Sequence, residues 1–386
     1  MEERTRAYLR GRFRDHYRRI EVSPPPAAAE REWGHIPWTS GSGTTMVRHQ
    51  SLLDLGDLSD FLARERPRHV YFSAGRYRDP GANSMDEKGW QGSDLVFDLD
   101  ADHLPSVDPD RDAYGEMLAA CKDALERLLS FLEADFGFED LTVVFSGGRG
   151  YHVHVRDAGV HDLDRGERRE IVDYVRGRGL DYDALVQTEQ RGTVTGRALQ
   201  TAGGWGRRTH RRLLALVDEL HAADEETALD RLQEFEGIGE KHAETIYGVA
   251  TDNREALATG NVEVGGPGLR RLVDVVAHET VEAENAPIDE PVTTDINRLI
   301  RLPGSLHGGS GLAVRRIDRD ALDEFDPLVD AVPATFRNHD IAVDVTDGGA
   351  VDLGGDSFTL PEGEQTVPEY VGVFLMARGR AEKGRE

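Results

Sequence analysis

The chain has 386 residues, 38% of them hydrophobic, which suits one large domain or two smaller ones with a real core. No apolar run approaches the roughly 20 residues that span a bilayer. The single cysteine, Cys121, excludes a disulfide framework and a cysteine-rich zinc site. We therefore expect a cytoplasmic protein without a membrane segment.

The formal net charge is −26, from 72 acidic and 46 basic residues, and only four of the basic residues are lysine. This excess of acid taken alone argues against a nucleic-acid binder, because phosphate contacts require basic groups. Acid-rich, lysine-poor chains are, however, expected in a cytoplasm holding molar salt, where the Debye length falls to about 3 Å. Short bidentate arginine–phosphate contacts survive there. The alternative is an acidic partner-binding surface, so charge does not decide the function.

The periodicity of apolar residues predicts the following elements in chain order. Helices are expected over 1–20, 112–135, 161–185 and finally 368–377, and strands over 69–73, 94–100, 141–145, 151–155, 294–302 and 312–317. The Gly/Ser/Thr-rich stretch 33–45 is expected to form turns. Strands before and after a helical block predict an α+β fold, with a core of residues 1–202 and 287–386 and a helical insertion over 203–286.

Two carboxylates end the strand expected over residues 94–100. Alternate strand residues share a face, so Asp98 and Asp100 point the same way, with Cα atoms roughly 6.6 Å apart. Such a pair can bracket two divalent ions, and oxygen ligands suit Mg²⁺ or Mn²⁺. The alternative is an ordinary strand end, where aspartate is common.

A glycine-rich turn joins the next two strands. Its glycines let backbone N–H groups face an anion, and its hydroxyl and guanidinium groups suit phosphate. An ordinary hairpin remains the alternative. The candidate nucleotide contacts of this segment are Ser146, Gly147, Gly148, Arg149 and His152.

The third segment runs from residue 294 to 309. Asp295 is a candidate third metal ligand, and Arg301 and His307 are candidate triphosphate contacts. Taken singly, Asp295 also fits a turn or a helix cap, and His307 also fits a turn.

These three segments, together with Arg31-Glu32-Trp33, Val47-Arg48-His49 and Lys88-Gly89-Trp90, resemble the catalytic small subunit of archaeal and eukaryotic DNA primases. The resemblance covers most of residues 1–155 and 287–316 and is nearest to haloarchaeal members of the archaeo-eukaryotic primase superfamily.

The resemblance implies a primase fold of mixed β-sheets flanked by helices. It also implies an acid triad of Asp98, Asp100 and Asp295 that binds two Mg²⁺ or Mn²⁺ ions. The expected reaction is template-directed nucleotidyl transfer from NTPs, and also dNTPs, on single-stranded DNA. Arg149, His152, Arg301 and His307 are expected to offset phosphate charge. A large subunit carrying an iron–sulfur cluster is the implied partner.

Two positions depart from the family pattern. Residues 102–121 offer only His103 and Cys121 as soft ligands, so the zinc knuckle of many relatives is not expected. Gly309 stands where some relatives have a lysine, so one phosphate contact is either missing or supplied by another arginine.

Three other functions stay open. A gap-filling or repair polymerase of the same superfamily is the nearest, followed by a two-metal nuclease and a non-catalytic replication scaffold. Residues 235–243 also resemble a helix-hairpin-helix turn that contacts DNA, although an ordinary turn in the helical lobe is the favoured interpretation.

Overall fold

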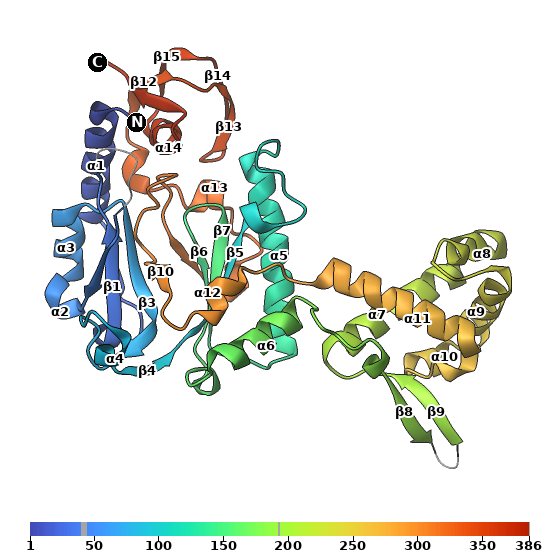
Figure 1. Cartoon of the computed structure of the whole chain (residues 1–386). Helices are drawn as coiled ribbons and strands as arrows, with labels where there is room; N and C mark the ends of the chain where they lie inside the picture. Colours follow the sequence, from blue (N-terminus) through green and yellow to red (C-terminus); the bar gives the residue numbers. More distant parts are fainter. Residues whose placement is uncertain (40–44, 192–193, 386) are drawn as a thin grey trace. The chain divides into compact units, whose positions relative to one another are not determined.

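The computed structural model describes residues 1–39, 45–191 and 194–385. Its contacts divide the chain into two compact units (Figure 1). Unit 1 contains Met1–Leu125, Glu139–Val172 and Pro287–Glu386, and unit 2 contains Glu126–Phe138 and Asp173–Ala286. The sheets and helices confirm the predicted α+β class, and every pairing between the named strands is antiparallel.

The first sheet of unit 1 has the order β10-β3-β1-β2, and β4 pairs with β3. Helices α1 and α3 cover its outer face, where the ring of His35 meets that of Phe61 at a centroid distance of 5.3 Å (Figure 1). Its strands are β1 (Arg31–Ile36), β2 (Val47–Gln50), β3 (His69–Tyr77), β4 (Trp90–Ser93) and β10 (Leu299–Arg301). The accompanying helices are α1 (Glu3–Tyr17), α2 (Leu52–Leu55), α3 (Leu58–Glu65), α4 (Met85–Lys88) and α12 (Glu290–Thr294).

The second sheet of unit 1 has the order β11-β6-β7-β5. Its strands are β5 (Leu95–Asp100), β6 (Leu141–Phe145), β7 (Gly150–Val155) and β11 (Arg315–Ile317). The two sheets face each other, because Phe72 of β3 stacks on His154 of β7 at a ring-centroid distance of 5.9 Å. Ala74, Val96, Val292 and Ile300 form a buried apolar cluster in the same layer.

The opposite face of the second sheet packs on helix α5 (Tyr114–Ala134), whose apolar residues recur at helical spacing. Cys121 is fully buried there, and its Sγ lies 3.5 Å from the carbonyl oxygen of Leu99. Burial of Phe97 and Leu99 on this side leaves the other face of β5 to its aspartates.

The C-terminal part of unit 1 forms two small sheets around helix α14 (Glu369–Ala377), which is buried along most of its length. The strands are β12 (Asp340–Val345), β13 (Gly349–Leu353), β14 (Asp356–Leu360), β15 (Gly363–Pro368) and β16 (Ala381–Lys383). A short helix, α13 (Pro327–Asp330), precedes them, and α6 (Arg165–Val175) begins in unit 1.

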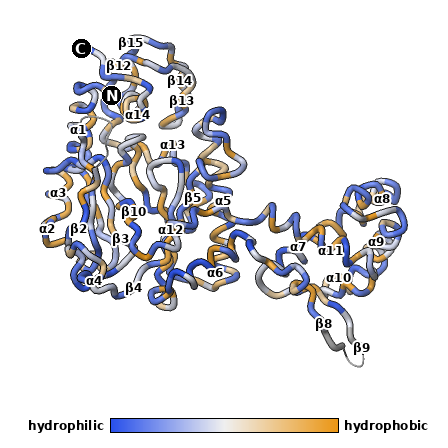
Figure 2. The backbone as a smooth tube through the Cα atoms, in the orientation of Figure 1, coloured by the Kyte–Doolittle hydropathy of each residue, from blue (hydrophilic) through white to orange (hydrophobic). Residues whose placement is uncertain are grey.

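Unit 2 is mainly helical. Figure 2 shows apolar and polar residues alternating along α7 (Gly204–Ala222) and α11 (Gly266–Glu284), as expected for helices that bury one face. Arg208 is buried here, and its guanidinium pairs with Asp135 and Glu284. The remaining elements are β8 (Val186–Arg191), β9 (Val194–Leu199), α8 (Glu225–Gln233), α9 (Glu240–Asp252) and α10 (Arg254–Ala258).

The candidate helix-hairpin-helix segment of residues 235–243 covers the turn after α8 and the first turn of α9. Phe235 and Ile238 are buried beneath it, and Gly237 adopts a φ of 81°, which side chains avoid. Its contact with DNA stays a prediction.

Four sequence predictions were wrong. Arg31–Ile36 is a fully buried strand, although its neighbourhood was expected to form turns, and residues 40–44 of that stretch lie outside the described ranges. The helix expected over 161–185 is shorter, because glycines follow it at 177 and 179, both with positive φ. The strand expected over 294–302 is confined to Leu299–Arg301, and the strand expected over 312–317 is confined to Arg315–Ile317.

None of the helices in the described ranges combines the length and apolarity needed to cross a membrane.

Candidate active site

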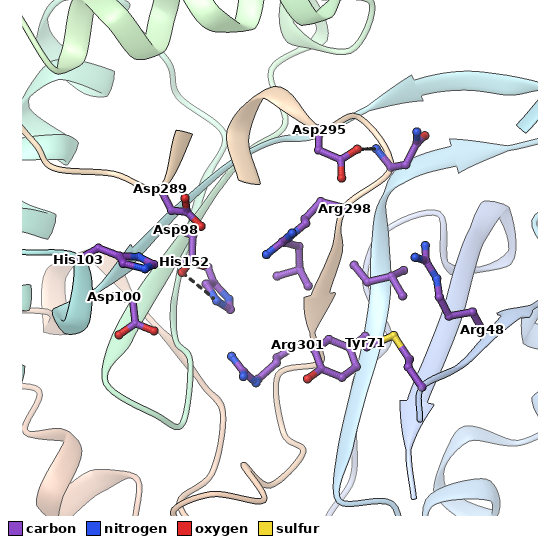
Figure 3. Close-up of a pocket in the computed structure, with 14 residues that line it drawn as sticks. Arg48, Tyr71, Asp98, Asp100, His103, His152, Asp289, Asp295, Arg298 and Arg301 are labelled. Carbon is purple, nitrogen blue, oxygen red and sulfur yellow. Dashed lines mark hydrogen bonds and ion pairs between the residues drawn. The ribbon is translucent and has the colours of Figure 1, made fainter. Parts of the chain in front are cut away.

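A cavity of about 460 Å³ in unit 1 collects the predicted carboxylates (Figure 3). Asp98 and Asp100 reach it from β5, where they pair in register with His152 and Gly150 of β7. This volume lies within the roughly 300–1,000 Å³ of small-molecule sites. The lining residues are Met46, Arg48, Tyr71, Asp98, Asp100, His103, His152, Asp289, Asp295, Asn297, Arg298, Leu299, Ile300 and Arg301.

The two β5 carboxylates repel each other. Burial, and then the charge of Asp100, raises the pKa of Asp98 to about 6. The Asp98 side chain is 23% exposed, so a ligand can reach it. A hard cation suits this pair, because it supplies the positive charge that the carboxylates lack.

His152 contacts the carboxylate pair directly. Its Nε2 lies 3.3 Å from Asp98 Oδ1 (Figure 3). Burial, and then the charge of Arg301, lowers the pKa of His152 to about 3, and burial likewise lowers the pKa of His307 well below its ordinary value. Both rings are therefore neutral at neutral pH, so neither supplies the positive charge expected from the sequence. They can still donate an N–H to an anion.

Two arginines, Arg301 in β10 and Arg298 immediately before β10, face the carboxylates (Figure 3). Arg301 is held by the pairing of β10 with β3, opposite Tyr71, and its guanidinium lies 5.8 Å from the Tyr71 ring centre. The Nε of Arg301 is buried without a hydrogen-bond partner in the described part of the chain. An unpaired buried donor beside a cavity favours an anionic ligand. Arg298 lies in the same wall and had no role assigned from the sequence.

Asp295 lies in the same cavity wall as Arg298, at the end of α12. Its Oδ1 accepts a hydrogen bond from the backbone N–H of Asn297 at 2.9 Å, which fixes a turn. Within the described ranges, no three His, Cys, Asp or Glu side chains lie close enough together to hold a metal ion. The structure therefore brings Asp295 to the cavity of Asp98 and Asp100 without assembling a three-residue ligand set.

The glycine-rich turn lies beside the cavity rather than in its wall. Ser146 is buried, and its hydroxyl accepts a hydrogen bond from the backbone N–H of Gly148 at 3.3 Å. A side chain at Gly147 would approach His307 Cβ to 2.7 Å, so the turn and His307 are in close contact. Arg149 forms an ion pair with Asp102, so its guanidinium is engaged in this state.

Gly150 is where this turn re-enters the sheet, and it approaches β5 closely. A Cβ at Gly150 would lie 1.8 Å from the backbone oxygen of Leu99. We expect Gly150→Ala to lower the free energy of unfolding by about 1–3 kcal/mol or more, because the overlap is with backbone that cannot move aside. Urea titration in constant potassium chloride measures this loss. Gly159→Ala, where nothing lies within 4 Å, is the control, and equal losses in both variants would contradict the steric account.

A buried ion cluster supports the wall of the cavity. Glu32, 1% exposed, accepts from the Lys88 ammonium at 2.5 Å and pairs with Arg48, which lines the cavity, at 3.2 Å. Burial alone would raise the pKa of Glu32. Hydrogen bonds from Lys88, the His49 backbone and Arg48 have the larger combined effect, so the pKa of Glu32 lies below its ordinary value. Glu32 therefore stays charged and orients Arg48.

Removing the Lys88 ammonium should leave a buried carboxylate short of a partner. We expect Lys88→Met to lower the free energy of unfolding by about 3 kcal/mol, the low end for a broken buried pair, because Arg48 still contacts Glu32. Urea denaturation checks this, with exposed Lys241→Met as the control. Glu32→Gln in the Lys88→Met background should recover part of the loss, and no recovery would show that packing, rather than charge, is responsible.

Five lining residues with charged or aromatic side chains received no role from the sequence. They reach the cavity from separate elements through long-range pairing: for example, the backbone N–H of Asp289 bonds to the Asp98 carbonyl at 2.9 Å. The only sign of them in the sequence was the presence of charged residues within or next to the quoted motifs. These residues are Arg48, Tyr71, His103, Asp289 and Arg298.

The family model for the DNA primase small subunit matches residues 97–319. Proteins named DNA primase small subunit PriS are similar over the whole chain, with 100% of each chain covered: 66% identical in Haloarcula marismortui, 62% in Halobacterium salinarum and 38% in Methanococcoides burtonii. Such identity over full length confirms the resemblance seen in the motifs, including its haloarchaeal character. The chain therefore belongs to the DNA primase small subunit family.

Proposed function

We propose that the chain makes primers on single-stranded DNA by nucleotidyl transfer from NTPs, and also dNTPs, in the cavity of Asp98 and Asp100. Family membership places it among the DNA-directed nucleotidyltransferases of the primase class. The observation that carries the site assignment is one cavity with two adjacent carboxylates on one wall and Arg298 and Arg301 on the other.

The family implies dependence on divalent metal, and we infer two Mg²⁺ or Mn²⁺ ions held by Asp98, Asp100 and, after a shift of its turn, Asp295. The raised pKa of Asp98 supports this fit, since a cation relieves the repulsion of two neighbouring carboxylates. When bound, such ions supply Lewis-acid polarisation of the phosphoryl group and activation of the attacking hydroxyl.

The chain's own residues bind and orient the nucleotide. Arg301 and Arg298 bind the triphosphate from the β10 wall, and the neutral ring of His152 donates Nε2–H toward Asp98 or a phosphate oxygen. Ser146, Gly147, Gly148 and Arg149 contact phosphate at the turn, together with His307. Arg149 must first exchange its Asp102 partner for the ligand. No side chain acts as a nucleophile; the contribution is electrostatic.

The partner implied by the name of the relatives is a larger subunit. We infer a heterodimer with a primase large subunit that binds any iron–sulfur cluster, since one buried cysteine, Cys121, cannot hold one. A cytoplasmic site of action follows from this replication role. Zinc is not expected in the chain, because Cys121 is packed against β5.

A primer-synthesis assay on single-stranded DNA in molar potassium chloride tests the proposal. It should supply Mg²⁺ or Mn²⁺, offer NTPs and dNTPs separately, and run with and without the large subunit. Products from unprimed template support a primase. Extension of supplied primers alone would indicate the repair-polymerase alternative, and loss of template would indicate a nuclease.

A further inference from the structure

A second cavity, of about 320 Å³, lies in unit 1 and shares no lining residue with the cavity of Asp98 and Asp100. It lies where β5 begins and β7 ends, at the opposite end of these strands from the glycine-rich turn. Its charged lining consists of Arg31, Arg76, Asp94, Asp140, Arg156 and Arg316. Four guanidinium groups therefore meet two carboxylates, in a chain whose net charge is strongly negative.

The floor of this second cavity is a fixed ion network. Asp94, 1% exposed, accepts two hydrogen bonds from Arg31 Nη2, at 3.0 and 2.9 Å, and one from Arg156 Nε at 2.9 Å. Arg156 also donates to the hydroxyl of Thr142 at 2.8 Å. The single carboxylate of Asp94 thus pairs with two guanidinium groups, so the network carries a net positive charge.

Two further arginines of this cavity are uncompensated. Among the described residues, neither Arg76 nor Arg316 has a side-chain ion pair or hydrogen bond, and Arg76 Nε is buried without an acceptor. A buried guanidinium N–H without an acceptor costs free energy, and native proteins place an acceptor there. Asp140 is exposed at the rim, so the cavity is open to a ligand.

We propose that this second cavity is a binding site for a phosphate-class anion, held by the guanidinium groups of Arg76 and Arg316 above the Arg31–Asp94–Arg156 network. Guanidinium forks match the oxygens of phosphate bidentately, a match that monatomic chloride cannot offer even at molar concentration. Inorganic phosphate, the pyrophosphate released by nucleotidyl transfer and the phosphates of a free nucleotide share this chemistry. The site is separate from the proposed active site.

Thermal unfolding of the full chain tests this proposal, with phosphate, pyrophosphate or ATP titrated at constant ionic strength set by potassium chloride. A ligand that binds only the folded state raises the melting temperature in a saturable way. We expect Arg76→Gln/Arg316→Gln to weaken the phosphate and pyrophosphate effects by about tenfold or more, the loss of a charge-assisted hydrogen bond. Exposed Arg10→Gln, at a position that lines neither cavity, should leave the effect of phosphate unchanged.

The source of the anion is read from the three titrations. If the double substitution weakens the rise in melting temperature caused by phosphate and pyrophosphate but not by ATP, the site binds inorganic anions. If it weakens the rise caused by all three, the site binds nucleotide phosphates as well. The proposal would be overturned if each anion raised the melting temperature equally in the wild type and the double variant. It would also be overturned if no anion raised the melting temperature more than chloride does. If the double variant is poorly folded, equilibrium dialysis of radiolabelled pyrophosphate against the single variant Arg316→Gln, at an exposed position, decides it.

Discussion

Asp98→Asn is expected to abolish primer synthesis, lowering its rate by about 10³-fold or more. Metal-assisted transfer draws several kcal/mol of transition-state stabilisation from the bound ions, and each 1.36 kcal/mol is tenfold in rate. The amide keeps the shape of the side chain but removes the charge that the cation requires. A primer-synthesis assay at saturating NTP measures the loss, and calorimetric titration with Mn²⁺ measures the weakened metal binding.

The protein should stay folded in this variant. Burial raises the pKa of Asp98, so its charged form opposes folding at neutral pH, and replacing it should leave the melting temperature of the metal-free protein unchanged or higher. Asp123→Asn, an exposed carboxylate on α5, is the matched control and should retain full synthesis. Near-normal synthesis by Asp98→Asn would contradict the assignment of the active site.

Arg301→Gln is expected to lower kcat/KM for the incoming nucleotide by about 10- to 150-fold, with most of the change in KM. A hydrogen bond to a charged group contributes roughly 1.5–3 kcal/mol, and the buried Nε of Arg301 has no other described partner. Nucleotide-concentration series on a fixed, saturating template measure the effect. Arg301→Lys should recover only part of it, because an ammonium keeps the charge but not the bidentate fork.

Arg10→Gln, at an exposed position on α1, controls for the general loss of positive charge. Template affinity, measured by fluorescence anisotropy of labelled single-stranded DNA, should not change in Arg301→Gln. A fall in template affinity with an unchanged nucleotide KM would place Arg301 on the nucleic-acid path rather than on the triphosphate.

Local periodicity predicted the β5 and β7 strands well. Alternation over residues 94–100 placed Asp98 and Asp100 on one face, and the structure brings both into one cavity. The strand β1 was missed because all of Arg31–Ile36 is buried, charged residues included, so it carries no alternation of apolar and polar residues. Arg31 and Glu32 are residue types typical of a surface, and only the structure shows that each is buried next to a partner of opposite charge.

The sequence by itself determined the α+β class, the family and the carboxylate pair, because each depends on residues close together in the chain or on a motif order. Only the tertiary structure decided which distant residues meet these carboxylates. The pairing of β10 with β3 brings Arg301 to the cavity, and the salt bridge from Glu32 orients Arg48. It also decided that His152 and His307 are neutral, because burial sets their pKa and burial is a property of packing, not of local sequence.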